Sequence, residues 1–298
     1  MFRKSQGINL GGLEEIRNMP IHVLYIVLGA ALTHATWNLF LKQTGDRMAM
    51  MCAMHTVTGM LALAAMPWVG GVIALESWPL LIASMIIHGG YYLFLIRSYT
   101  HGDLGLTYPI ARGMAPLLVG GASILLLDDP VTQLQLLAFG LTAVGILTLG
   151  LRNSTSLRKH PQALLYALGT GVFIGSYTVV DGMGVRLSGN VWAYMSWLFT
   201  LEMLLTLAVT MSRFRRETAR VLIGTGRKGI WAGIFSAYAY GSVMWAMNEA
   251  PIMLVSALRE TSVVMASLLA VVVLKERFDP FRILAAVLVA VGVVLLKL

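Results

Sequence analysis

The sequence predicts an all-α membrane protein with ten transmembrane helices, arranged as two inverted five-helix repeats around a central cavity. The chain has 298 residues, of which 57% are hydrophobic and only 12% are charged, whereas a soluble domain carries about 25% charged residues. Apolar runs of about 20 residues recur along the chain, which is the length that an α-helix needs to cross a bilayer. The second half of the chain also repeats the first.

The repeat is clearest in the last two apolar runs of each half, where residues 108–151 align with residues 255–298 without a gap. Identical residues include Arg112/Arg259, Leu127/Leu274, Ala138/Ala285, Leu141/Leu288, Ala143/Ala290, Val144/Val291 and Gly145/Gly292. A charge within the bilayer costs roughly 2.5–3.5 kcal/mol, so a matched arginine is unlikely to arise by chance. A duplicated hydrophobic unit is common among secondary transporters, which bind substrate between the copies.

Long apolar runs without alternation predict helices, because a helix satisfies its own backbone polar groups in lipid. The predicted spans are 20–42, 48–74, 78–100, 105–127, 131–151, 162–185, 190–212, 229–248, 251–274 and 280–298. Five spans precede a linker at 152–161 and five follow it, so the second copy enters the membrane from the opposite side. The predicted domains are a polar tail at 1–19, a first repeat at 20–151 and a second repeat at 162–298.

The net charge of +8 is interpreted as loops near cytoplasm and anionic lipid, and no nucleic-acid partner is expected. Cys52 is the only cysteine, so an intrachain disulfide and a cysteine-based metal site are excluded. No cofactor is expected. Basic residues concentrate in the odd-numbered loops, which favours both termini outside, but Arg3, Lys4 and Arg17 in the tail oppose export. The orientation stays open.

Polar and aromatic residues inside the predicted spans are the candidate site residues. His34 and Asn38 share one face of span one, with Trp37 beside them, and they either line a cavity or form interhelical hydrogen bonds. Tyr91 in span three and Tyr238 in span eight are related by the repeat. The remaining candidates are Tyr177 and Asp181 in span six, Glu202 in span seven, Trp245 in span eight, and Arg112, Arg259 and Glu260 in spans four and nine.

The two arginines suggest two alternatives. A guanidinium binds carboxylate, phosphate or phosphonate oxygens in a bidentate manner, so the pair could hold an acidic substrate between the halves. Alternatively, Arg112 or Arg259 forms an internal ion pair with Asp181, Glu202 or Glu260. Both alternatives hold if the two arginines change partners during transport. The sequence contains no catalytic motif, which argues against an enzyme.

The segment 256–262, Ser-Ala-Leu-Arg-Glu-Thr-Ser, which leads to Leu-Lys-Glu-Arg at 274–277, resembles the EamA-type proteins of the drug/metabolite transporter superfamily. Asp129 replaces the usual glutamate in the first repeat. The run 34–38, His-Ala-Thr-Trp-Asn, followed by Lys42, resembles a subgroup found beside phosphonate-utilisation genes. This resemblance implies ten helices in two inverted repeats, a central cavity lined by helices one, three, four, six, eight and nine, and outward transport of metabolites or drugs, with proton coupling in several members.

Together these observations predict a secondary transporter that exports or exchanges a small polar anionic or zwitterionic metabolite by alternating access, in the inner (plasma) membrane. Arg112 and Arg259 would hold the acidic group, the aromatic candidates with His34 and Asn38 would shape the pocket, and Asp181, Glu202 or Glu260 would carry a coupling proton. The expected partners are the substrate, protons and the lipid bilayer, in a monomer or homodimer. The alternatives are a multidrug exporter for lipophilic cations and a membrane enzyme using His34 and His88.

Overall fold

The structure, a computed structural model, describes residues 20–101, 104–126, 132–151, 161–274 and 280–295. The first repeat contains α2 (Ile21–Lys42), α3 (Arg47–Val69), α4 (Trp78–His101), α5 (Leu104–Leu125) and α6 (Gln133–Leu151). The second contains α8 (Pro161–Leu187), α9 (Val191–Phe214), α11 (Gly226–Glu249), α12 (Ile252–Arg259), α13 (Thr261–Leu274) and α14 (Pro280–Leu295). Short helices are η1 (Leu75–Ser77), η2 (Arg215–Glu217) and α10 (Thr218–Gly224). The predicted tail at 1–19 lies outside the described residues, as do most of the linker and the breaks at 128–130 and 275–277.

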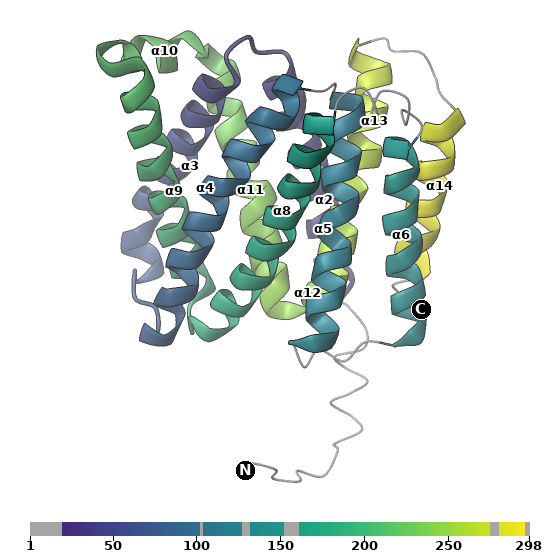
Figure 1. The fold of residues 1–298 in the computed structure, drawn as a ribbon. Helices are drawn as coiled ribbons and strands as arrows, with labels where there is room; N and C mark the ends of the chain where they lie inside the picture. Colours follow the sequence, from purple (N-terminus) through teal and green to yellow (C-terminus); the bar gives the residue numbers. More distant parts are fainter. Residues whose placement is uncertain (1–19, 102–103, 127–131, 152–160, 275–279, 296–298) are drawn as a thin grey trace.

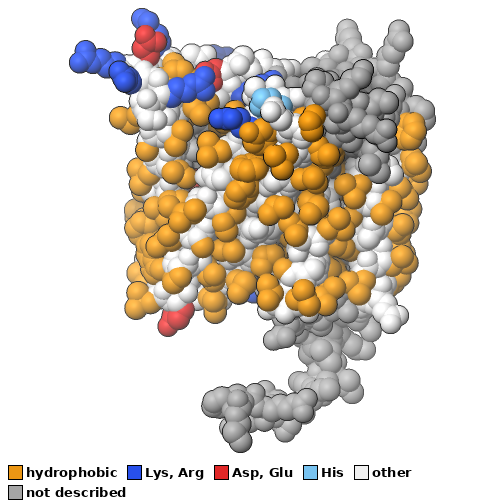
Figure 2. Space-filling view, viewed as in Figure 1, with side chains coloured by type: hydrophobic (Ala, Val, Ile, Leu, Met, Phe, Trp, Pro, Cys, Tyr) orange, Lys and Arg blue, Asp and Glu red, His pale blue; other side chains and the backbone are white. Residues whose placement is uncertain are grey.

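The long helices run side by side as one bundle whose flank is apolar (Figures 1 and 2). Within the described residues, five segments are long and apolar enough to cross a membrane by length and composition, namely 21–41, 47–69, 75–101, 161–187 and 191–224. Lys and Arg side chains gather at the end of the bundle where α10 lies, above the band of hydrophobic side chains (Figure 2). This distribution is expected for a multi-pass membrane protein.

The helix contacts follow the duplication. Helix α4 of the first repeat packs against α8, and its counterpart α11 packs against α2. Helix α5 likewise packs against α8, while α13 packs against α2. The pairs α3 with α9 and α6 with α14 each join equivalent helices. Exchanging the two halves therefore maps one set of contacts onto the other, and the predicted fold of two five-helix repeats is confirmed.

Two glycines show how closely the helices approach. A Cβ at Gly171 in α8 would lie 2.7 Å from the carbonyl oxygen of Ala111 in α5. A Cβ at Gly292 in α14 would lie 2.7 Å from the carbonyl oxygen of Ala138 in α6. Backbone atoms cannot move aside as a side chain can, so both contacts require glycine. Small residues commonly allow such close approach between membrane helices.

The predicted ninth span is not one helix, which corrects the expected segment 251–274. Helix α12 ends at Arg259 and α13 begins at Thr261. At the break, the Thr261 hydroxyl donates to the carbonyl of Leu258 at 2.7 Å, and the Val263 amide donates to the carbonyl of Glu260 at 3.0 Å. Side-chain competition of this kind interrupts the regular helical hydrogen bonding.

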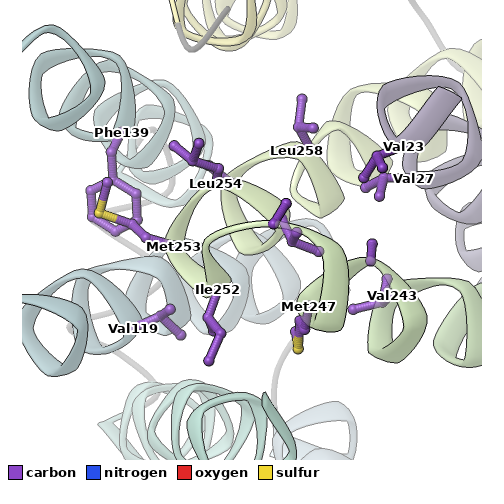
Figure 3. Close-up of a cluster of buried hydrophobic side chains, with 14 of the residues drawn as sticks. Val23, Val27, Val119, Phe139, Val243, Met247, Ile252, Met253, Leu254 and Leu258 are labelled. Atoms are coloured by element: carbon purple, nitrogen blue, oxygen red, sulfur yellow. The ribbon is translucent and has the colours of Figure 1, made fainter. Parts of the chain in front are cut away.

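Helix α12 is buried along its whole length, from Ile252 to Arg259. Its apolar side chains form the centre of a hydrophobic cluster that also includes Val23 of α2, Val119 of α5 and Val243 of α11. In Figure 3 the side chains of Ile252, Met253, Leu254 and Leu258 spread from α12 towards several neighbouring helices. The helix that carries Arg259 is therefore held by packing from both repeats.

Candidate functional site

The two predicted arginines meet at the centre of the bundle. Arg112 of α5 is 3% exposed and Arg259 of α12 is 2% exposed, while Glu260 between α12 and α13 is fully buried. Nε of Arg112 lies 2.7 Å from Oε2 of Glu260, and Nε of Arg259 lies 3.7 Å from Oε1 of the same carboxylate. We call these three residues the arginine cluster. Of the three acids considered from the sequence, the ion-pair partner is Glu260 rather than Asp181 or Glu202.

The helix break and the cluster depend on each other. Nη2 of Arg112 donates to the carbonyl oxygen of Arg259 at 3.4 Å and to the hydroxyl of Ser262 at 3.2 Å. Nη2 of Arg259 donates to the hydroxyl of Thr178 in α8 at 3.1 Å. A carbonyl freed at a helix break needs a partner in the membrane interior. The arginine of the first repeat supplies that partner for the break in the second repeat.

The arginine cluster is not electrically balanced. It contains two guanidinium groups, and within the described part of the chain Glu260 is the carboxylate at ion-pair distance from them. The cluster therefore carries one formal positive charge in a buried place, where an uncompensated charge is costly. A bound carboxylate, phosphate or phosphonate group would compensate it, and guanidinium geometry suits those groups.

A small cavity of about 50 Å³ lies beside the cluster. Its wall comes from α2, α3, α4, α8, α9 and α11 and consists of His34, Trp37, Met54, His88, Tyr91, Tyr92, Tyr177, Phe199, Glu202, Ser236, Ala239 and Tyr240. Such a volume holds only a few water molecules. The cavity as described is therefore too small for a metabolite, and we call this state closed.

Tyr177 belongs both to the cavity wall and to the surroundings of Arg259. Its ring forms part of the cavity wall, and Cζ of Arg259 lies 5.9 Å from the ring centroid. Neither arginine is among the described residues that line the cavity.

The other candidate residues divide into four groups. His34, Trp37, Tyr91 and Tyr177 line the cavity, together with Glu202. Asn38 is not in its wall, and its side-chain amide donates to the His34 carbonyl within α2 at 2.8 Å.

Asp181 is fully buried and accepts hydrogen bonds from the hydroxyls of Tyr194, at 3.1 Å, and of Tyr240. It thus belongs to the interhelical packing between α8, α9 and α11.

Tyr238 and Trp245 do not reach the cavity. They line a separate apolar groove of about 570 Å³ between α2, α3, α9 and α11, and 46% of Tyr238 is exposed. Tyr240 occupies the cavity wall instead. Two residues along a helix correspond to a rotation of about 200°, so Tyr238 and Tyr240 point to nearly opposite sides. The alignment with Tyr91 indicated the correct span but not the correct face.

Sequence reasoning also missed a polar chain between α3, α4 and α9. The Tyr92 hydroxyl lies 2.7 Å from Nε2 of His55 and 3.2 Å from Oε1 of Glu202. Nε2 of His88 lies 3.4 Å from the same carboxylate oxygen. We call His55, His88, Tyr92 and Glu202 the Glu202 network. Its signal was present in the sequence, because His55 is an ionisable residue within an apolar span.

A buried, charged centre between two repeats, beside a cavity within the bundle, is an arrangement found in membrane transporters. Residues 22–151 and 161–298 each match the EamA-like transporter family. The chain belongs to this family, and it is accordingly a multi-pass membrane transporter of a small molecule and not an enzyme.

Solved structures support the fold. One of them, described only as the crystal structure of a protein, superposes with a TM-score of 0.70 at 17% identity, covering 93% of this chain and 97% of that chain. At this identity the likeness supports the fold alone. No curated protein is similar enough in sequence to count as a match.

Proposed function

We propose that the chain exports or exchanges a small polar metabolite with an anionic or zwitterionic head by alternating access. The observation that carries this proposal is the arginine cluster, in which equivalent arginines of the two repeats share one carboxylate and leave one positive charge uncompensated. A phosphonate is one candidate, in keeping with the resemblance of residues 34–38. The same site suits a carboxylate or a phosphate ester.

The substrate anion would act by competing with Glu260. In the closed state Glu260 links Arg112 of the first repeat to Arg259 of the second. An anion that binds the guanidinium groups weakens this link, so that the repeats can separate on one side. Binding energy would then be used to open the ion pair, as a ligand shifts an equilibrium only through its different affinity for the two states.

We place the α10 end of the bundle in the cytoplasm and the protein in the inner (plasma) membrane. The exposed basic residues at this end are Arg213, Arg215, Arg216, Arg220, Arg227 and Lys228. Loops rich in Lys and Arg remain on the cytoplasmic side. Modification of a single cysteine introduced at Arg220, with a reagent that does not cross membranes, tests this placement. Labelling of intact cells would contradict it.

Transport measurements test the proposed substrate class. Purified protein is first screened by thermal stability against carboxylates, phosphate esters, phosphonates and amino acids, because a ligand of the folded state raises the melting temperature. Counterflow of the best ligand into proteoliposomes is then compared for the wild type, Arg112→Lys and the matched surface variant Arg220→Lys. Arg112→Lys is expected to lose most of the flux, because lysine cannot replace bidentate guanidinium contacts.

Arg220→Lys is expected to transport like the wild type, because Arg220 is exposed on α10. Equal flux for Arg112→Lys and the wild type would remove Arg112 from the binding site.

A multidrug exporter for lipophilic cations is the second candidate. It is favoured by the cavity wall, where Glu202 lies among Trp37, Tyr91, Tyr177 and Tyr240. Aromatic faces and a carboxylate bind quaternary cations well. Stabilisation and counterflow with tetraphenylphosphonium, together with no response to any anion, would favour this candidate over metabolite transport.

A further inference from the structure

The Glu202 network has a hydrogen-bond pattern that can hold an additional proton. Nδ1 of His88 lies 3.0 Å from the carbonyl oxygen of Ser84 and 3.2 Å from the Ser84 hydroxyl, and a hydrogen on Nδ1 suits both, because the carbonyl only accepts and the hydroxyl can accept. Nε2 of the same ring then faces Oε1 of Glu202 at 3.4 Å. A nitrogen lone pair against a carboxylate oxygen is repulsive unless an additional proton lies on one of the two groups. With the hydrogen of Nδ1 directed at the Ser84 carbonyl, the pair His88–Glu202 holds one additional proton.

Among the described residues, no Lys or Arg lies at ion-pair distance from Glu202 to replace this proton. Its side chain is 4% exposed, and His88 is the basic residue at ion-pair distance in the described part of the chain. The titratable groups that face it from the neighbouring helices are His55 of α3, Tyr92 of α4, Tyr177 and Asp181 of α8, and Tyr240 of α11, with Arg259 of α12 behind Tyr177. A proton is thus the charge that neutralises the carboxylate when the cavity is closed.

The network and the arginine cluster share one side chain. The ring of His88 stacks on that of Tyr177, with centroids 3.9 Å apart and planes inclined by 22°. Arg259 approaches the same Tyr177 ring at 5.9 Å. A proton on the network consequently adds positive charge near a cluster that already has one in excess. An anion bound to the cluster removes this repulsion, and charge interactions over such distances are strong away from water.

We propose that the Glu202 network is a proton-binding site and that the proton and the substrate anion bind to the same state of the carrier, each increasing the affinity for the other. This inference rests on the proposed function and adds that the coupling between proton binding and anion binding is positive. Thermodynamic linkage makes the effect reciprocal. Export would then be driven by the gradient of the anion or by exchange, and not by antiport against an incoming proton.

Sulfate and methanesulfonate are suitable probes, because their own charge is constant where histidine titrates, at about pH 5 to 8. The purified full-length protein is titrated with each anion, and the affinity is read from the melting temperature. We expect the affinity to rise about tenfold between about pH 8 and pH 6. In weakly buffered solution, adding the anion should raise the pH of the medium, as the protein takes up to about one proton per bound anion.

Two variants locate the proton. Glu202→Gln keeps the shape of the side chain but cannot ionise, and it should bind sulfate equally at both pH values without taking up protons. Tyr92→Phe removes only one hydroxyl and serves where Glu202→Gln does not fold; it should reduce the pH dependence several-fold. Glu76→Gln, the same substitution at an exposed carboxylate, is the matched control and should behave like the wild type.

The outcomes separate the two proposals. Anion binding with the same affinity at both pH values, or with proton release, overturns the coupling and leaves the proposed function in place. Proton uptake that persists in Glu202→Gln and disappears in Asp181→Asn moves the site away from the network and overturns its assignment. If no anion stabilises the protein or is transported, the proposed function fails and this inference fails with it.

Discussion

Helix α5 and the α12–α13 pair occupy equivalent places in the two repeats and both carry a buried arginine, yet only the second is interrupted. The position after the arginine differs as well. Gly113 follows Arg112, whereas Glu260 follows Arg259. A Cβ at Gly113 would lie 2.8 Å from the Leu147 side chain of α6, so the first copy has no room for an acid. Duplication thus supplied two cations, and divergence at one position supplied the single anion that joins them.

The comparison also explains the position of the charge. If both repeats carried Arg-Glu, the centre would be neutral and would attract an anion less strongly. If neither did, two buried guanidinium groups would repel each other without a partner. One glutamate for two arginines holds the repeats together and still leaves one positive charge. The asymmetry between the copies is therefore the basis of the proposed anion site.

The largest effect is expected from Glu260→Gln, which removes the acid that distinguishes the second copy. Two buried guanidinium groups then lose their shared partner, and breaking a buried ion pair typically costs roughly 3–5 kcal/mol. The melting temperature should fall strongly without ligand, and sulfate should restore more of it than in the wild type, because the anion replaces the carboxylate. A variant as stable as the wild type would show that Glu260 does not hold the cluster.

A smaller effect is expected from Ser262→Ala, which makes the second copy resemble the first, where Ala115 is equivalent. Ser262 is fully buried and accepts from Nη2 of Arg112 at 3.2 Å. Losing a hydrogen bond to a charged group costs about 1.5–3 kcal/mol. Unfolding at rising concentrations of a denaturing detergent measures this loss of stability. Ser212→Ala, on the exposed end of α9, is the control. No loss of stability would mean that Arg112 is held by Glu260 alone.

Gly113→Ala adds a Cβ atom to the first repeat at the position where the second repeat carries the Glu260 side chain. The Leu147 side chain must move by a few tenths of an ångström, and overpacking of this kind costs typically about 1–3 kcal/mol, with the lower end expected because leucine is flexible. Gly121→Ala, at a position in the same helix with open space, should be neutral or slightly stabilising. Equal behaviour of the two variants would contradict the tight packing between α5 and α6.

The smallest effects on stability are expected in the eighth span, where Tyr238 is equivalent in sequence to Tyr91 of the third span. Tyr240→Phe should cost about 1 kcal/mol through the lost hydrogen bond to Asp181. Tyr238→Phe should remain within about 0.5 kcal/mol of the wild type, because Tyr238 lies on the apolar groove. The reverse ranking, in stability or in transport, would return Tyr238 to the central site.

The fold class could be predicted from the sequence, because it depends on the length of the hydrophobic stretches and on the position of the charges within them. A hydrophobic stretch must have a certain length to cross a bilayer, and charges within such a stretch are rare enough to stand out. Spans one to eight agree with the described helices to within a few residues. The sequence also singles out Arg112, Arg259 and Glu260 as buried charges that either pair with one another or bind substrate. The duplication was visible for the same reason, as a repeated order of apolar and charged residues.

What only the tertiary structure decided is the direction in which each side chain points around its helix. Residue number determines the depth of Tyr238, Tyr240 and His55 in the membrane, but the rotation of a helix is set by its packing against its neighbours. Three features depend on that packing. The arginines pair with Glu260 and not with Asp181 or Glu202, the helix breaks after Arg259, and the Glu202 network brings together residues of three helices. Composition and repeat thus specified the spans and their duplication, while contacts between distant segments determined which charges meet.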